Sequence, residues 1–320
     1  MDDVCALVLT RNRKGLLFEC LSGLRRMTVP AARIVIVDNA SSDGTEDALR
    51  AEGVLDQPDV VYVRLEENTG SAGGYSKGIE VAREQPVDWI WIMDDDAEPE
   101  PEALERLLAS PYAREERTAA LASAVVVPSG DVDVLHRGRI RRFLRELPAS
   151  EYVPGNHVAL GYCSFTGMMV RAEVARAEDP PRADFFIWFD DVEYSIRLRR
   201  HGEIRLVPES RVGHKFQMGG TADTRRSRFW NRLLGTSYTS NDWADYWKNL
   251  NGIRNFMWVK HQYGNPSLPE FGFLLGGYVV KTLMFEPRPL RRIPWIVRAA
   301  LAGRRGQPLA LTAERWAQVS

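Results

Sequence analysis

The sequence has few cysteines and almost no net charge. Its 320 residues include three cysteines, Cys5, Cys20 and Cys163, and no CxxC pair. An odd and scattered set of cysteines argues against a disulfide framework or a zinc site and is typical of a reducing compartment. The net charge of −1 provides no general attraction for nucleic acid, so we expect no nucleic-acid partner.

The sequence also has no recognisable signal peptide and no long apolar run. The N-terminal residues, MDDVCALVLTRNR, are acidic and then strand-like. The longest apolar stretch runs from Phe271 to Phe285, which is shorter than the ~20 residues of a spanning helix, and Lys281 interrupts it. We therefore expect a cytoplasmic protein without a membrane span. The signatures GxGxxG and GxxxxGK[ST] are absent as well, which argues against a dinucleotide fold and a P-loop.

Apolar runs alternate with helical patterns in the first half of the chain. Such alternation predicts βαβ units and an α/β fold with a mostly parallel sheet. The runs are rich in Val and Ile, as expected for parallel strands buried on both faces. The predicted strands are VCALVLT, RIVIVDN, VVYVRL, WIWIMDDD and AALASAVVVP, and the predicted helices are Gly15 to Met27, Thr45 to Glu52, Ser71 to Glu84 and Glu100 to Ala109.

The second half is less regular. Residues from Ser129 to about Leu160 lose periodicity and carry the arginine cluster RGRIRRFLREL, so we expect a variable and partly mobile insertion. SFTGMMV then predicts a strand, DVEYSIRLRRHG a helix, and EIRLVPES and RVGHKF two short strands. Beyond Phe216 the pattern becomes helical and aromatic. We expect two regions, a catalytic domain over residues 1–215 and a helical region over 216–320.

Polar residues follow four of the predicted strands. Ligands of such sheets bind beyond the carboxyl ends of the strands. One polar strand end is explained by a solvated loop, but four at one edge favour a site. Asp38 could accept a hydrogen bond from a base or a ribose, although it could also simply form the turn before NASSDG. The four endings are Thr10-Arg11-Asn12, Asp38-Asn39, Glu66-Glu67-Asn68 and Asp94-Asp95-Asp96.

The three aspartates after WIWIM need a cation. Adjacent carboxylates repel one another, and burial without partners is costly. A divalent metal that carries a phosphate resolves the conflict, and Mg²⁺ or Mn²⁺ suits oxygen ligands. Asp94 and Asp96 could reach a ribose and a metal-bound diphosphate, with Asp95 in support. The alternative is an acidic approach to the helix at Pro99-Glu100, where the helix dipole favours acids.

A glycine-rich segment, NTGSAGGYSKG, follows the third strand and opens a helix. Gly70, Gly73 and Gly74 let the backbone approach a ligand closely, and the N-terminus of a helix favours an anion. The alternative is that these glycines allow tight packing of the helix.

Four ordered motifs resemble the inverting family-2 glycosyltransferases. The motifs are LVLTRNR, VIVDNASSDGT, ENTGSAGGYSKG and WIWIMDDDAEP, and the resemblance covers roughly residues 3–215. It implies a GT-A fold with flanking helices, a nucleotide diphosphate sugar as donor, and Mn²⁺ or Mg²⁺ as cofactor. Within this group the sequence is most similar to bacterial galactofuranosyltransferases and related rhamnosyltransferases of cell-wall and O-antigen synthesis. The QxxRW motif of the processive synthases is missing.

The same resemblance implies roles for individual residues. In DFFIWFDDVEYSIRLRRHG, Asp191 corresponds to the catalytic base, and Trp188, Asp190 and Glu193 to residues at the acceptor. The metal ligands correspond to Asp94, Asp96 and His214, the last in RVGHKF. In LNGIRNFMW the Arg254-Asn255 pair matches the family, but Leu250 stands where an aromatic residue is expected. The predicted nucleotide-sugar contacts are Thr10, Arg11, Asn12, Asp38, Asn68, Gly70, Gly73, Gly74, Asp94 and Asp95.

The expected function is transfer of galactofuranose from UDP-galactofuranose to a lipid-linked or polysaccharide acceptor in cell-envelope synthesis. One alternative is a rhamnosyltransferase that uses dTDP-rhamnose, since base and sugar contacts come partly from the backbone. Alternatives of another class are a nucleotidyltransferase and a non-catalytic protein that binds sugar nucleotides or glycans.

The arginine-rich tail predicts contact with a membrane surface. In EPRPLRRIPWIVRAALAGRRG, arginines alternate with Ile293, Trp295, Ile296, Val297 and Leu301. Basic residues beside Trp and aliphatic residues describe a segment in the interface with anionic lipid. We expect peripheral binding at the inner face of the plasma membrane. The alternative is an interface in a homo-oligomer or a helical cap on the core.

Overall fold

The computed structural model of the chain describes residues 2–140, 144–215, 225–235, 238, 240–309 and 311–319. The chain forms two compact units, Met1–Ala183 with Asp190–Gln217, and Asp184–Phe189 with Met218–Ser320. The units differ from the predicted regions in the short segment Asp184–Phe189, which belongs to the second unit. The predicted boundary between residues 215 and 216 adjoins residues 216–224, outside the described ones. The functional division into two regions stays a prediction.

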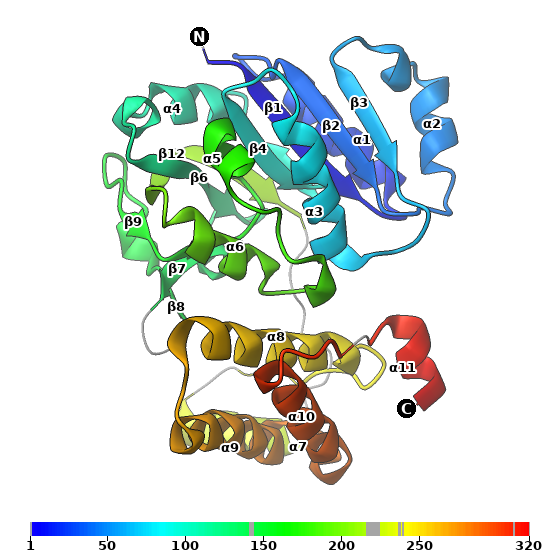
Figure 1. The fold of residues 1–320 in the computed structure, drawn as a ribbon, viewed down its shortest axis with the longest axis vertical. Helices are drawn as coiled ribbons and strands as arrows, with labels where there is room; N and C mark the ends of the chain where they lie inside the picture. The colour runs from blue at the N-terminus through cyan, green and yellow to red at the C-terminus, as the bar shows by residue number, and fades with distance from the viewer. Residues whose placement is uncertain are drawn as a thin grey trace. The chain divides into compact units, whose positions relative to one another are not determined.

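The first unit is built around one mixed sheet, drawn from blue to green in Figure 1. In the described residues it has nine strands in the order β3-β2-β1-β4-β11-β6-β12-β5, with β9 beside β12. The first four strands are parallel, but β11 runs antiparallel to both β4 and β6. The sheet is therefore mixed, but β1, β2, β3, β4, β6 and β12 all run in the same direction, so six of its nine strands are parallel in direction as predicted, with β11 inserted between them in the opposite direction. The strands are β1 Val4–Thr10, β2 Arg33–Asp38, β3 Val60–Arg64, β4 Trp89–Asp94, β5 Ala97–Pro99, β6 Thr118–Val126, β9 Ala159–Leu160, β11 Met168–Arg171 and β12 Glu203–His214.

Helices cover both faces of this sheet. Successive side chains of a strand point to opposite faces, so a strand that is apolar throughout needs cover on both sides. In β1, Ala6 and Val8 pack with helices of one layer, and Leu7 and Leu9 with helices of the other. The first layer contains α1 Lys14–Arg25, α2 Thr45–Ala51 and α4 Ala103–Ala109, and the second α3 Gly70–Arg83, α5 Ala172–Ala177 and α6 Asp190–Leu198.

The polar strand ends lie at one edge of the sheet. Thr10 is paired with Asp38 across β1 and β2, and Leu9 with Asp94 across β1 and β4. Because these strands are parallel and in this register, their carboxyl ends meet. The prediction that the polar ends share one edge is confirmed for these strands.

The segment predicted as a partly mobile insertion contains short strands in its described residues. β7 Arg137–Ile140, β8 Leu144–Glu146 and β10 Tyr162–Cys163 form a second, three-stranded sheet in the order β10-β7-β8. Leu147, the residue directly after β8, is fully buried in the hydrophobic core of the first unit. Residues 141–143 of the arginine cluster lie outside the described residues. Short 3₁₀ helices occur at Val54–Asp56, Pro111–Arg114, Val134–His136, Ala149–Glu151 and Ala183–Phe185.

The two short strands predicted in EIRLVPES and RVGHKF are one strand, β12. Its pairing with β6 shifts register between Val207 and Arg211. Pro208 lies in that interval and has no N–H to donate, so a bulge replaces regular pairing there. β12 continues to His214 and pairs with β5 through Val212 to His214. Phe216 of the quoted motif lies outside the described residues.

The second unit is helical in its described part. α8 and α10 cross closely: a Cβ added to Gly303 would lie 2.2 Å from the backbone oxygen of Arg254. Leu250 and Met257 of α8 share a core with Ile296 of α10. Helix α10 is part of the tail predicted to lie in a membrane interface, and one of its faces packs inside this unit. The helices are α7 Arg225–Leu234, α8 Tyr246–Gly264, α9 Leu268–Phe285, α10 Pro289–Arg304 and α11 Ala313–Val319.

The apolar run near residue 280 is longer in the structure than the sequence indicates. Helix α9 begins at Leu268, where Ser267 and Glu270 form a capping box. Its 18 residues have a mean hydropathy of 1.2, and 17% of them are buried. By length and composition alone, this helix in the described part of the chain could cross a membrane, contrary to the expectation of no such segment. α9 therefore presents a largely exposed apolar surface.

Candidate functional site

The aspartates after β4 are held by hydroxyl groups of three elements. Tyr75 of α3 donates from its OH to Asp94 Oδ1 at 2.5 Å, and Thr166 donates to Asp94 Oδ2. Thr10, at the end of β1, donates to Asp95 Oδ2 at 2.8 Å. The predicted residue Thr10 therefore orients the acidic cluster. Tyr75 and Thr166 were not predicted, since an isolated hydroxyl residue gives no signal in the sequence.

A guanidinium partly neutralises this cluster. Arg13 Nη1 lies 3.3 Å from Asp95 Oδ1 and 3.0 Å from Asp96 Oδ2. Burial raises the pKa of the Asp95 carboxyl to about 6, although Thr10 and Arg13 oppose the shift. Arg11 of the motif LTRNR was predicted as a site residue, whereas Arg13 was not. Both arginines are exposed, and Arg13, through its ion pairs with Asp95 and Asp96, supplies part of the positive charge expected at the strand end.

Asp94, Asp96 and His214 form a group that fits a divalent metal. One potential ligand atom of each lies within 4.8 Å of the others. In the described part of the chain, Asp96 Oδ1 and His214 Nδ1 are buried without a hydrogen-bond partner. His214 Nε2 lies 3.3 Å from Asp96 Oδ1. Two carboxylates and an imidazole suit Mn²⁺ and, with added water ligands, Mg²⁺. The structure brings together the three residues predicted as ligands.

His214 would be protonated more readily than a free histidine in this arrangement. Burial disfavours the charged imidazole, but Asp96 and Asp94 outweigh it, so the pKa of His214 is raised. A bound metal requires the neutral imidazole, hence metal and proton compete at this residue.

A second group shares His214 and was not predicted. Asp133 and His136 have ligand atoms within 4.8 Å of one another and of His214. The rings of His136 and His214 meet edge to face with centroids 5.0 Å apart. His136 Nδ1 lies 2.7 Å from Ser164 Oγ, so part of its bonding capacity is already used. His136 was not predicted as a ligand, because DVDVLHRG resembles no ligand pattern.

Asp190 and Asp191 begin helix α6. The backbone N–H of Val192 donates to Asp191 Oδ1 at 2.7 Å. Asp190 is almost fully buried, and its Oδ2 has no hydrogen-bond partner in the described residues. Burial raises the pKa of both carboxyl groups, and the charge of Asp94 adds to each shift. A carboxylate with a raised pKa is a stronger base than an ordinary aspartate, as proton abstraction from a hydroxyl group requires.

Arg137 is a fully buried cation of this unit that the sequence analysis did not single out. Its guanidinium donates to the backbone oxygens of Ser123 at 2.8 Å and Thr166 at 2.7 Å. Its charge lowers the pKa of Asp191 slightly against the effect of burial. Arg137 therefore fixes the backbone next to Thr166, whose side chain holds Asp94.

Glu193 was predicted to contact the acceptor, and the structure places it in an internal ion pair. It is 2% exposed, and Arg197 donates from Nε to Glu193 Oε1 at 3.0 Å and from Nη2 to Oε2 at 3.0 Å. With both carboxylate oxygens bound inside the protein, Glu193 stabilises helix α6. This arrangement does not support a direct acceptor contact.

The segment before Asp190 is strained and belongs to the second unit. Phe186, Trp188 and Phe189 have φ values of 62°, 64° and 68°, in the left-handed region that bulky residues rarely adopt. Asn255 Nδ2 donates to the backbone oxygens of Phe185, Ile187 and Trp188 at 2.9–3.0 Å. Strain of this kind persists where surrounding contacts enforce it, and it concentrates at functional sites.

The glycine-rich segment serves both the turn and the packing of α3. Gly70 has a φ of 73°, and its N–H donates to Asn68 Oδ1 at 3.0 Å. A Cβ at Gly74 would lie 2.4 Å from Leu9 Cδ1, and one at Gly73 would lie 2.4 Å from Thr69 Cβ. For Gly73 and Gly74 the structure supports the alternative of helix packing, and their predicted donor contact stays a prediction.

The side chains at the end of β2 form hydrogen bonds within the protein. Asp38 is fully buried, and it accepts hydrogen bonds from the N–H of Ser41 at 2.7 Å and the OH of Tyr62 at 2.8 Å. Asn12 accepts from the N–H of Ser42 at 2.6 Å. The alternative of a turn-forming Asp38 is supported, because both of its carboxylate oxygens are used. Its contact with a base or ribose stays a prediction.

Comparison with known sequences identifies the family. Residues 5–178 match the family described as "Glycosyl transferase family 2". The chain belongs to this family. The matched residues include the acidic cluster and the glycine-rich segment, so the predicted family is confirmed.

Two characterised relatives of the chain are galactofuranosyltransferases. The chain is 29% identical over 206 residues to galactofuranosyltransferase GlfT1 of Mycolicibacterium smegmatis, with 62% of this chain and 66% of the relative covered. It is 32% identical over 209 residues to GlfT1 of Mycobacterium tuberculosis, with 63% and 66% covered. The similarity thus spans slightly less than two thirds of the relatives' length.

Solved structures of similar shape confirm the GT-A fold. One is GalNAc-T7 with UDP, GalNAc and Mn²⁺, with a TM-score of 0.61, 16% identity, and coverage of 82% of this chain and 48% of that one. Another is S. aureus TarS 1–349 in complex with UDP-GlcNAc, with a TM-score of 0.54, 14% identity, and coverage of 95% and 92%. At these identities the similarity concerns the fold.

Proposed function

We propose that the protein transfers galactofuranose from UDP-galactofuranose to a hydroxyl group of a glycan acceptor, with inversion at the anomeric carbon. The observation that carries this proposal is the group of Asp94, Asp96 and His214 in the same unit as Asp191. The charge of Asp94 acts on Asp191, so the two carboxylates are within electrostatic reach. Such a transfer needs a metal site that stabilises the leaving diphosphate and a carboxylate that takes the proton of the acceptor hydroxyl.

Asp191 acts as the general base. It takes the proton of the acceptor hydroxyl as that oxygen forms a bond to the anomeric carbon and the bond to the donor diphosphate breaks. The N–H of Val192 orients the carboxylate. Attack from the face opposite the leaving group gives inversion, and the nucleoside diphosphate leaves with the bonding electrons.

Asp94, Asp96 and His214 would hold a Mn²⁺ or Mg²⁺ ion. Such an ion, when bound, stabilises the negative charge of the departing diphosphate. Tyr75 and Thr166 fix the direction of Asp94, and Arg13 balances the remaining charge of Asp95 and Asp96. The Mn²⁺ in the GalNAc-T7 structure supports this assignment by its presence in a protein of the same fold.

The galactofuranosyltransferase activity of the two mycobacterial relatives favours galactofuranose as the transferred sugar. The UDP found with GalNAc-T7 and TarS favours uracil as the base of the donor nucleotide. Rhamnose from dTDP-rhamnose is the second candidate, based on the sequence resemblance. A lipid-linked or polysaccharide acceptor, a role in cell-envelope synthesis and a location at the cytoplasmic face of the membrane complete the proposal.

A donor panel tests the proposal. Purified protein is incubated with Mn²⁺, a synthetic glycoside acceptor and UDP-galactofuranose, UDP-galactopyranose or dTDP-rhamnose, and the released nucleoside diphosphate is quantified. We expect acceptor-dependent release of UDP from UDP-galactofuranose, and loss of release in Asp94→Asn. Release from dTDP-rhamnose alone would assign the rhamnosyltransferase, and no release from any donor would contradict a transferase.

A further inference from the structure

Two groups of potential metal ligands occur in the described part of the chain, and both contain His214. Asp94 and Asp96 complete the first group, and Asp133 and His136 complete the second. The proposed transfer uses the first group alone and gives Asp133 and His136 no role. The groups also differ in composition, since the first has two carboxylates and one imidazole and the second has one carboxylate and two imidazoles.

The fold brings the second group together at the end of strand β6. β12 pairs in parallel with β6 up to the last residue of β6, and β12 itself ends at His214. The chain after β6 turns back on it through an isolated antiparallel bridge. Asp133 follows this bridge, and its Oδ1 accepts a hydrogen bond at 3.1 Å from the N–H of Leu135, in the 3₁₀ helix that ends at His136. Strand pairing and this helix cap therefore hold the backbone of all three residues in place.

The separations within the second group match those of ligands around one ion. His136 Nε2 lies 3.5 Å from Asp133 Oδ2, which is long for a hydrogen bond. Two ligand atoms on a tetrahedral zinc ion, each bonded at about 2.0–2.1 Å, lie roughly 3.4 Å apart. Two imidazoles on such an ion have ring centres roughly 5 Å apart. The ring centroids of His136 and His214 are 5.0 Å apart, so one ion could bind all three side chains with small adjustments.

The other ring nitrogen of His136 lies beside a hydroxyl group. Nδ1 is 2.7 Å from Ser164 Oγ. When Ser164 accepts a hydrogen bond from Nδ1–H, the lone pair of the ring is on Nε2, the nitrogen next to Asp133. Metal-bound histidines usually donate their second N–H to a neighbour in this way, which fixes the tautomer and the ring direction. The side chains of His136 and Asp133 are 13% and 17% exposed, so an ion can reach them from solvent.

The composition of the second group favours zinc. Imidazole ligands suit Zn²⁺, whereas carboxylates and water suit Mg²⁺ and Mn²⁺. At one and the same set of nitrogen and oxygen ligands, zinc also binds more tightly than manganese. Two histidines and one carboxylate form a known type of zinc site, which needs no cysteine and keeps a fourth position for water. The scattered cysteines of this sequence therefore do not exclude it.

His214 can serve only one of the two groups at a time. A neutral imidazole has one N–H and one unprotonated nitrogen, so it offers a single lone pair to a metal ion. His214 Nε2 lies 3.3 Å from Asp96 Oδ1, and its Nδ1 is buried without a hydrogen-bond partner in the described residues. An ion in the second group that takes His214 leaves Asp94 and Asp96 to bind their own ion without the imidazole.

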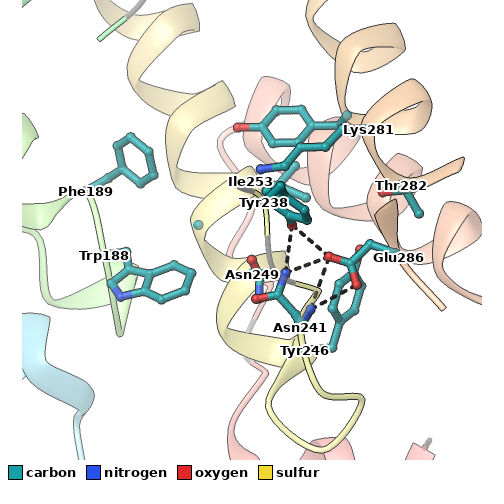
Figure 2. A pocket seen from close by; sticks show the side chains of 12 residues that line it. Trp188, Phe189, Tyr238, Asn241, Tyr246, Asn249, Ile253, Lys281, Thr282 and Glu286 are labelled. Carbon is teal, nitrogen blue, oxygen red and sulfur yellow. Dashed lines mark hydrogen bonds between the residues drawn. The ribbon is translucent and has the colours of Figure 1, made fainter. Parts of the chain in front are cut away.

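A cavity of the helical unit offers no comparable cation site. Figure 2 shows Glu286 at this cavity, and it is the one carboxylate among the described lining residues. Glu286 accepts hydrogen bonds from Tyr238 OH at 2.8 Å and from Asn241 Nδ2 at 2.7 Å. Arg292 Nη1 lies 3.2 Å from its other oxygen. The charge of this carboxylate is thus already balanced inside the protein.

We propose that Asp133, His136 and His214 bind a zinc ion, and that this ion competes for His214 with the ion of Asp94 and Asp96. Only the second part rests on the proposed function, because it concerns the metal of the transfer. Zinc in the second group removes the imidazole from the first group and weakens the binding of Mn²⁺ there. Zinc is then an antagonist of the metal-dependent transfer.

Metal binding to matched variants tests the site. Full-length protein is freed of metal, its Zn²⁺ affinity is measured by competition with a chromophoric chelator, and its Mn²⁺ affinity by the free-ion signal in electron paramagnetic resonance. We expect His136→Ala to weaken zinc at least about tenfold and to leave Mn²⁺ within about twofold, and Asp94→Asn to do the reverse. Unchanged zinc affinity in His136→Ala, an equal loss of zinc affinity in Asp94→Asn, or wild-type protein that binds zinc no more tightly than Mn²⁺ would overturn the assignment.

A conservative variant and a histidine control accompany this test. Asp133→Asn keeps the oxygen that accepts from the N–H of Leu135 but removes the charged ligand, so it should also weaken zinc and serves if His136→Ala is unstable. His157→Ala is the control, because His157 pairs with Glu209 at 3.1 Å and belongs to neither group. We expect this control to bind zinc as the wild type does. An equal loss of zinc affinity in the control and in Asp133→Asn would contradict the proposal.

The shared imidazole has a readout of its own. His214→Ala should weaken the binding of both ions, and wild-type protein loaded with one equivalent of zinc should bind Mn²⁺ no more tightly than His214→Ala does. If the zinc-loaded wild type bound Mn²⁺ as tightly as the zinc-free protein, the competition for His214 would be wrong. These measurements need neither donor nor acceptor. If zinc binds as expected but no donor yields a nucleoside diphosphate, the zinc site stands and the transferase proposal fails.

Discussion

His214 Nε2 lies 3.3 Å from Asp96 Oδ1, and this contact links the end of β12 to the acidic end of β4. β5 follows β4 in the chain and pairs with β12, where Ala97 is opposite His214. The contact is therefore fixed by strand pairing on one side and by the end of a buried strand on the other. A ligand set held in this way is largely formed before any ion arrives.

Replacing His214 should weaken metal binding. We expect His214→Ala to lower the affinity for Mn²⁺ by roughly 10–100-fold, the range found when a metal site loses a supporting group. The free Mn²⁺ signal in electron paramagnetic resonance measures this affinity. His157→Ala is the control, because His157 pairs with Glu209 at 3.1 Å and is absent from both candidate ligand groups. Equal affinity in the two variants would remove His214 from the site.

Replacing Asp191 should stop transfer without releasing the donor. Asp191→Asn keeps the shape but removes the proton acceptor, so kcat should fall ~10²–10⁴-fold while the donor Kd stays within about twofold. Since the pKa of Asp191 is raised by burial, the wild-type kcat/KM should decline with falling pH at a value above the ordinary pKa of an aspartate. Steady-state kinetics measures both effects. Asp179→Asn, an exposed carboxyl nearby in the chain, should behave as wild type.

Asp190 should destabilise the fold at neutral pH. Burial raises its pKa, so the folded state holds this proton more tightly than the unfolded state. Stability then decreases as the pH rises above the ordinary pKa of an aspartate and through the raised one. We expect Asp190→Asn to raise Tm at pH 7 and to change it little at pH 4, with exposed Asp56→Asn as the control. If Tm changed equally at both pH values, the effect of the substitution would not depend on the ionisation of Asp190. That outcome would contradict the raised pKa of its carboxyl group.

The two classes of glycine should respond differently to a methyl group. Gly74→Ala places a Cβ 2.4 Å from Leu9 Cδ1, so it should destabilise the protein by about 1–3 kcal/mol. Gly15→Ala meets nothing within 4 Å on helix α1 and should be neutral or stabilise by about 0.5–1 kcal/mol. Urea denaturation measures both. If Gly74→Ala were as stable as wild type but could not bind donor, Gly74 would serve the ligand and not the packing.

Much of the first unit could be predicted from sequence because its signals are local. The apolar run of β4 and the alternation of strands and helices define the sheet, and the register of parallel strands brings Thr10, Asp38 and Asp94 to one edge. The bulge at Pro208 was not predicted, because a proline between two apolar segments also fits two separate strands, and two strands were expected there. Strand β11 was predicted, but its direction was not, because periodicity carries no information on orientation.

The parts of the site that were missed depend on contacts between distant segments. Arg13 was overlooked beside Arg11, since nothing in LTRNR reveals which arginine turns toward the aspartates. Glu193 was predicted as an acceptor contact from the family resemblance; Arg197, one helical turn later, binds its carboxylate, and the acceptor contact stays a prediction. His136 directly precedes β7 of the second sheet and meets His214 edge to face, and this part of the sequence has no periodic signal.

The configuration of the product tests the central claim most directly. The protein is incubated with Mn²⁺, UDP-galactofuranose and a synthetic glycoside acceptor inside an NMR tube, and the anomeric proton of the new sugar is followed with time. We predict a galactofuranoside whose anomeric configuration is opposite to that of the donor, formed together with one UDP per sugar transferred and halted by chelator. A product that retains the donor configuration, or one that forms at the same rate in excess chelator, would contradict the account.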